Sequence, residues 1–177
     1  MRNLVLSVIG DDRPGLVSAL ADAIASNGGS WDRSQLAQLA GKFAGIVVVT
    51  VAAADADDLI SSVTKLDGLL DVVVHDGGGD IVSGDDWTAL HIGLLGNDRS
   101  GIVQEISTAL STTGATIENM TTGTREAPMA GGLLFEADFD VRIPPGVELS
   151  DVRAQLEHLA AELLVDLDID ATTVAVD

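Results

Sequence analysis

The chain has 177 residues, a formal net charge of −19, an apolar content of 46% and no cysteine. A surface with this much negative charge repels nucleic acid and anionic lipid. We therefore expect no direct contact with either. The lack of cysteine excludes disulfides, thiol catalysis and thiolate metal sites, and it fits a cytoplasmic location. No apolar run is long enough to span a bilayer, and the polar residues 10–13 interrupt the run in which a signal peptide would be sought.

The first half of the chain alternates between strand-like and helix-like periodicity. Apolar residues at every second position predict strands, and apolar residues three to four apart predict helices. The expected order is a strand over 3–9, a helix over 14–27, strands over 30–40 and 43–53, a helix over 56–66 and a strand over 70–75. Gly41-Lys42 is the expected hairpin turn, and Asp55 is the expected N-cap of the second helix. The helix residues expected to face inward are Leu16, Val17, Leu20, Ala23, Ile24, Leu59, Ile60, Val63 and Leu66.

The second half repeats this order. Strands are expected over 88–95, 116–125, 132–142 and 165–169 or slightly beyond, with helices over 100–113 and 150–164. The inward helix residues are expected to be Ile102, Val103, Ile106, Leu110, Val152, Leu156, Leu159 and Leu163. Each half is therefore a βαββαβ ferredoxin-like unit of the α+β class, with an antiparallel sheet and its helices on one face. We expect domains at 1–76 and 88–177, a Gly/Asp-rich linker at 77–87, and sheets paired side by side.

One octapeptide marks the duplication. Gly10–Val17, with the sequence GDDRPGLV, returns 86 residues later as Gly96–Val103, GNDRSGIV. Each copy lies at a strand-to-helix turn, where free N–H groups suit a small anion or carboxylate. The glycine spacing is that of a P-loop, but the Lys and Ser/Thr that a P-loop requires are replaced by aliphatic residues, which excludes nucleotide binding. Two interpretations of Asp12 and Asp98 remain: each holds the ammonium of a zwitterion, or each merely caps its helix.

Other polar residues give little support for catalysis or metal binding. Asp166, Asp168 and Asp170 alternate along the last strand; they either form a cation site or, as we favour, line its solvent face while Leu167 and Ile169 are buried. The three histidines are scattered and accompany no nucleophile with its base; they are His75, His91 and His158. We therefore expect no enzymatic activity, no catalytic residue, no metal and no cofactor.

The repeated loop also carries a family resemblance. Asp12-Arg13-Pro14-Gly15-Leu16-Val17 after a strand, within a βαββαβ unit, resembles the ACT domain, a regulatory module that binds amino acids. Segments 32–37 with 43–45, and 127–131 with 133–135, are similar to tandem-ACT proteins related to the glycine cleavage system transcriptional repressor. The resemblance covers nearly the whole chain. It departs from the family chiefly in the strong acidity and the Gly-rich linker.

The resemblance implies where a ligand would bind. In such domains the site lies where the first loop meets the start of the second strand. The residues that match are Asp12, Arg13, Gly15, Leu16, Val17 and Ser30 in the first unit, and Asp98, Arg99, Gly101, Ile102, Val103 and Thr116 in the second. Many amino-acid-binding members have Asn where this chain has Ser30 and Thr116.

The expected function follows from this resemblance. We expect a non-enzymatic amino-acid sensor, for glycine or serine among other candidates, that modulates a partner protein such as a transcription factor. The acidic surface suits a basic partner. Two alternatives are a structural oligomerisation module without a ligand and a trans-acting regulatory subunit of an amino-acid metabolic enzyme. Edge strands also make a homodimer a possible state.

Overall fold

The structure is a computed structural model that describes residues 1–66, 68–77, 86–127 and 131–172. The chain divides into two compact units, Met1–Ile81 and Val82–Asp177, and each is described by itself. Most of the predicted linker, residues 78–85, lies outside the described residues, as do residues 128–130 of one segment that carried the family resemblance.

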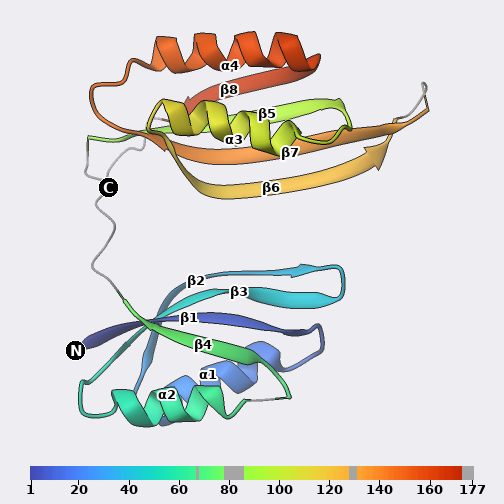
Figure 1. Cartoon of the computed structure of the whole chain (residues 1–177). Coiled ribbons are helices and arrows are strands. Elements are labelled where there is room, and N and C mark those ends of the chain that lie inside the picture. The colour runs from blue at the N-terminus through green and yellow to red at the C-terminus, as the bar shows by residue number, and fades with distance from the viewer. Residues whose placement is uncertain (67, 78–85, 128–130, 173–177) are drawn as a thin grey trace. The chain divides into compact units, whose positions relative to one another are not determined.

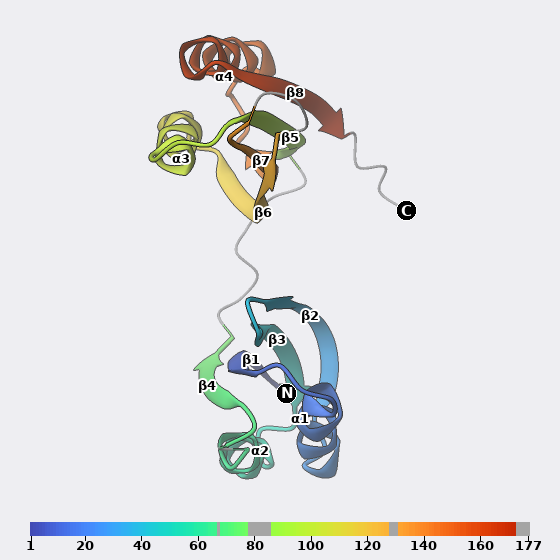
Figure 2. The same cartoon turned by 90° about the vertical axis from the view of Figure 1, so that its right-hand side faces the viewer.

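The first unit contains two helices and one sheet (Figure 1). Its elements are β1 (Arg2–Asp11), α1 (Leu16–Ser26), β2 (Ser30–Leu39), β3 (Lys42–Val51), α2 (Ala56–Thr64) and β4 (Asp71–Asp76). The strands form an antiparallel sheet in the order β2-β3-β1-β4. Both helices cover the same face of this sheet, so the other face carries no helix (Figure 2).

The second unit repeats the arrangement. Its elements are β5 (Thr88–Asn97), α3 (Ile102–Thr112), β6 (Thr116–Glu126), β7 (Leu133–Ile143), α4 (Leu149–Leu163) and β8 (Val165–Thr172). The sheet order is β6-β7-β5-β8, again antiparallel. The predicted fold class, two βαββαβ ferredoxin-like units, is therefore confirmed. Side-by-side pairing of the sheets stays a prediction.

Each unit has its own apolar core between its sheet and its helices. In the first unit the core is aliphatic, because alternate residues of β1 and β3 point at one helix face; its members include Leu4, Leu6, Leu20, Ile24 and Val49. In the second unit Phe139 is fully buried among aliphatic side chains. Both cores form because every second side chain of a strand points to the same side of the sheet, where it packs against the apolar face of a helix.

Two local expectations are corrected by the structure. Val17 and Val103 are exposed rather than inward, because the buried stripe follows every fourth residue from the first helical position. The hairpin turn is Ala40-Gly41 rather than Gly41-Lys42, since both residues have positive φ and Leu39 pairs with Lys42. Asp55 is the N-cap residue of α2, as expected, although its side chain makes no capping hydrogen bond.

Candidate functional site

The second glycine of each repeated loop sets the start of a helix. Gly15 and Gly101 are the N-cap residues of α1 and α3, with φ of +94° and +96°. This left-handed conformation suits glycine because it has no Cβ. A Cβ on Gly15 would meet no atom within 4 Å, so the glycine is required by backbone conformation and not by crowding.

The first glycine has a different role. A Cβ on Gly10 would lie 2.4 Å from the carbonyl oxygen of Leu69, and one on Gly96 would lie 2.3 Å from Cγ1 of Val165. Both contacts are with residues at or just before the start of the unit's last strand. The paired glycines of the repeat therefore serve close packing at one position and a left-handed turn at the other.

The loop aspartates do not cap the helices. Among the described residues, no side chain makes a capping hydrogen bond at the start of α1 or α3. Instead the backbone N–H of Asp12 donates to the carbonyl of Gly41 at 2.9 Å, and that of Asp98 donates to the carbonyl of Leu133 at 2.8 Å. Both carboxylates are exposed. The helix-capping interpretation is therefore wrong, and the first N–H groups of each helix have no intrahelical acceptor.

The two loop arginines brace their loops in different ways. Arg99 donates from both Nη atoms to Glu105, at 3.0 and 2.8 Å, which raises the pKa of Arg99 and lowers that of Glu105. Glu105 lies one turn into α3, so the second loop is tied to its own helix. In the first unit the repeat places Ala19 at that position, and Arg13 donates to the carbonyl of Gly68 instead.

A surface hollow of about 580 Å³ lies at the second loop. Five of the six residues predicted for the second unit line it, namely Asp98, Arg99, Gly101, Ile102 and Val103.

Three further lining residues were missed by sequence reasoning. Gln104 and Ser107 share a side of α3 with Val103 at helical spacing, which could have indicated them. Phe135 lies opposite Gly96 on β7, and only the strand register brings it to the loop.

The structure does not bring the predicted second-strand residues to these loops within one unit. Thr116 pairs with Arg142, whereas Asn97 at the loop pairs with Leu134, eight residues along β7 or roughly 27 Å away. Ser30 pairs with Thr50, at the β1 end opposite the loop. The helix returns the chain to the far end of the sheet before the second strand begins. Contrary to expectation, the loop and the start of the second strand do not meet inside a unit.

A second hollow, of about 330 Å³, lies on the helix-free face of the second sheet. It lies over Gly93, and its charged lining residues are Glu136, Asp138, Asp166 and Asp168. These groups are all acceptors when ionised, so they offer no donor to the carboxylate of an amino acid. This hollow is therefore unsuited to the expected zwitterion.

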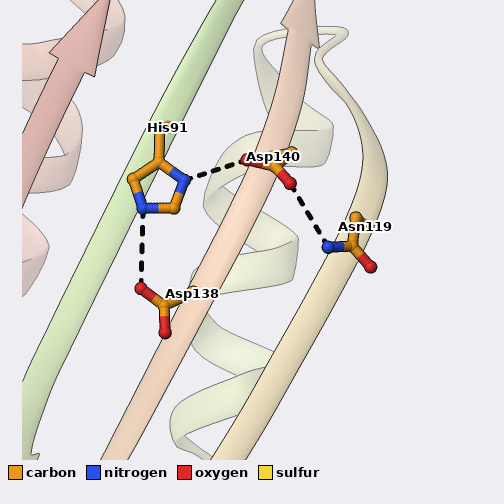
Figure 3. A network of polar contacts seen from close by, with 4 residues as sticks. All are labelled: His91, Asn119, Asp138 and Asp140. Atoms are coloured by element: carbon orange, nitrogen blue, oxygen red, sulfur yellow. Dashed lines mark hydrogen bonds and ion pairs between the residues drawn. The ribbon is translucent and has the colours of Figure 1, made fainter. Parts of the chain in front are cut away.

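Next to this hollow, His91 is held between two aspartates (Figure 3). Its Nδ1 lies 2.9 Å from Oδ1 of Asp140 and its Nε2 lies 3.5 Å from Oδ1 of Asp138, while Asn119 donates to Asp140 at 3.2 Å. The hydrogen bond with Asp140, together with the charges of Asp140, Asp138 and Asp170, raises the pKa of His91. The hydrogen bonds from His91 and Asn119 lower the pKa of Asp140.

The alternating aspartates of β8 line its solvent side. Asp166, Asp168 and Asp170 are exposed, whereas Ile169 is buried and Leu167 is half-buried. Within residues 1–66, 68–77, 86–127 and 131–172, no three His, Cys, Asp or Glu side chains are placed to hold a metal ion. The solvent-face interpretation of these aspartates is thus confirmed.

Comparison with known proteins relates part of the chain to a family. The family model of the ACT domain matches residues 2–75. No protein with a curated description matches the chain.

Within the part of the chain that the structure describes, no helix has the length and apolar character needed to cross a membrane.

Two of the solved structures that this chain resembles cover nearly all of it with a TM-score above 0.7. The structure of an unknown protein from Galdieria sulphuraria is 28% identical, with a TM-score of 0.86, and the match covers 97% of this chain and 99% of that one. A protein named "putative glycine cleavage system transcriptional repressor" is 13% identical, with a TM-score of 0.74 and 97% of each chain covered; that likeness concerns the fold. The ACT domain model therefore matches nearly the whole of the first unit, and the second unit repeats the same fold.

Proposed function

We propose that this chain is a cytoplasmic, non-enzymatic regulatory protein that binds a small amino acid and changes its affinity for a partner protein. The observation that carries this proposal is the hollow at the second loop. Five of the residues that line this hollow are ones that the sequence predicts for the site. The ACT fold of the first unit supports an amino acid as the class of ligand.

The lining groups suit the two ends of a zwitterion. The N–H groups at the start of α3 have no side-chain cap, and with the helix dipole they favour a carboxylate. The exposed carboxylate of Asp98 is the acceptor for the ammonium group. Arg99 is engaged by Glu105, so its role is to hold the loop rather than to bind the ligand. A small ligand such as glycine or serine satisfies both ends of this arrangement.

Regulation then requires that the ligand favour one state of the protein. A ligand shifts an equilibrium only by the difference between its affinities for the two states. We propose that the bound amino acid stabilises one arrangement of the units and thereby alters the binding of a partner such as a transcription factor.

The charge of the second sheet supports a basic partner. Its helix-free face carries exposed carboxylates from β7 and β8, the two strands that flank β5. They are Glu136, Asp138, Asp140, Asp166, Asp168 and Asp170. Such a face attracts a basic protein surface and repels phosphate.

The test is a thermal-shift screen of the full chain against the twenty amino acids, glycine and serine first. A ligand present at about 100 times its Kd adds about 2.7 kcal/mol to stability. We expect a selective rise in Tm that Asp98→Asn abolishes. Asp168→Asn, an exposed carboxylate in the other hollow, is the matched control and should leave the response intact.

Two outcomes contradict the proposal. A flat panel favours the structural module without a ligand. A response lost in Asp168→Asn but kept in Asp98→Asn would place the ligand in the hollow on the helix-free face instead of the hollow at the second loop. Affinity capture with the liganded chain then tests the partner: recovery of a metabolic enzyme would favour the alternative of a trans-acting regulatory subunit.

A further inference from the structure

The helix-free face of the first sheet carries branched aliphatic side chains. We define the aliphatic face as Val5, Ile9, Ile46, Val48 and Val73. Ile9, Ile46 and Val73 are 48%, 51% and 54% exposed, while Val5 and Val48 are half-buried. These residues lie on three adjacent strands, β3, β1 and β4. They alternate along the strands with core residues such as Leu6, Val47 and Val72, so they face away from the core and from α1 and α2, which cover the other face of the sheet (Figure 1).

The second sheet shows that the fold does not require this chemistry. Ser7 pairs with Ile46 and Val73, and Gly93, its counterpart 86 residues later, pairs with Asp138 and Asp168.

The neighbouring register position follows the same rule. Val5 pairs with Val48, and its counterpart His91 pairs with Asp140. Ile46, Val48 and Val73 of the first unit therefore take the places that Asp138, Asp140 and Asp168 hold in the second. The counterparts of Val5 and Ile9 are His91 and Leu95. Because carboxylates are compatible with these positions, the exposed aliphatic groups need a reason other than folding.

Removal from water is the usual reason for several adjacent exposed aliphatic side chains. A partner surface bearing charges would lose their hydration against this face, which is unfavourable unless the charges are paired. The acidic face of a second copy is therefore a poor partner, and the aliphatic face of a second copy is a good one. Two sheets pack face to face about 10 Å apart through such side chains.

The area of the first sheet and the net charge of the first unit are consistent with a second copy as the partner. The whole four-stranded sheet, with strands about 4.8 Å apart and up to about 34 Å long, gives a footprint of roughly 600 Å², which is at the lower end of the roughly 600–1,000 Å² per partner of a standard interface. Residues 1–76 carry 5 basic and 10 acidic groups, a net −5, whereas residues 88–177 carry 4 and 15, a net −11. Pairing through the first units brings the less charged parts of two copies together.

We propose that two copies of this chain associate through the aliphatic faces of their first units, sheet against sheet. The association does not rest on the proposed amino-acid site, because the face lies along the strands and not at the loop before α1. A protein that dimerises but binds no amino acid would contradict only the proposed function.

The test is the molar mass of the full chain in solution, measured by light scattering and sedimentation at about 100 µM. We expect a dimer for the wild type and a monomer for Ile46→Asp, which introduces the residue that the second sheet carries at the equivalent position. Met120→Asp, at a strand residue of the second unit that is 45% exposed, is the matched control and should stay dimeric. A monomeric wild type, or a dimer that survives Ile46→Asp, would overturn the proposal.

Two further variants keep the test decisive. Val73→Asp lies on the edge strand β4, so it gives the same test if Ile46→Asp fails to fold. The chain has no cysteine, so a single Ile46→Cys reports contact directly. A short bismaleimide should link two Ile46→Cys chains but not two Met120→Cys chains, and the reverse pattern would refute the assigned surface.

Discussion

The left-handed N-cap of α3 allows a quantitative test of the loop geometry. Gly101 has φ of +96°, a conformation that disfavours an L-residue by about 1–2 kcal/mol. For a unit of this size, each kcal/mol lowers Tm by about 4–8 °C. We therefore expect Gly101→Ala to lower the Tm of the second unit by roughly 4–16 °C, and Gly101→Asn to lower it much less, since asparagine tolerates this region.

Fluorescence assigns the loss to one unit. The chain has two tryptophans, Trp31 in the first unit and Trp87 in the second, so a Trp31→Phe background reports the second unit alone. The matched control is Gly123→Ala on β6, where φ is not positive and a new Cβ would make an ordinary contact of 3.6 Å with Glu136. Gly123→Ala should leave the Tm unchanged or slightly higher.

The first loop provides an independent check of the cause. At Gly15 a new Cβ meets nothing within 4 Å, whereas at Gly101 it lies 3.4 Å from Oε1 of Glu105. If backbone conformation alone sets the loss, Gly15→Ala and Gly101→Ala should destabilise their units equally. A wild-type Tm for either variant, or an asparagine variant as unstable as the alanine variant, would refute the reasoning.

Three other predictions concern the sheets and their cores. Gly45→Ala should destabilise the first unit by about 1–3 kcal/mol in urea titrations, because its Cβ would lie 2.0 Å from the backbone oxygen of Gln35, whereas Gly93→Ala, with 3.8 Å of clearance, should not. Phe139→Ala should lower the stability of the second unit by about 3–5 kcal/mol in the same assay, because Phe139 is fully buried. The pKa of His91 is raised, so the pair of His91 with Asp140 adds stability that is complete in mild acid and is lost as the pH rises through that raised pKa. The pKa of Asp140 is lowered, so the stability that ionised Asp140 contributes is lost only as the pH falls through that lowered pKa. The stability difference between wild type and His91→Val should therefore shrink between pH 5 and pH 8, and it should stay below about 1 kcal/mol because the pair is partly exposed and screened; a difference that grows over this range would contradict the assignment.

The duplication, the order of the elements and the class of fold follow from the amino-acid sequence alone. Apolar spacing is a local property, so strands and helices could be placed from it, and the two glycines in each loop marked the strand-to-helix turn. The sequence also indicated five of the residues that line the hollow at the second loop.

Which residues meet across strands depends on how the chain folds in three dimensions. The hairpin register brings Phe135 to the second loop, and the return of the chain through α3 carries Thr116 to the far end of the sheet. Register also revealed that Ile46 and Asp138 occupy equivalent places, which gives the two sheets opposite surfaces. Strand pairing joins residues distant in sequence, and a shift of one residue would exchange the two faces, so no local pattern could have supplied these facts.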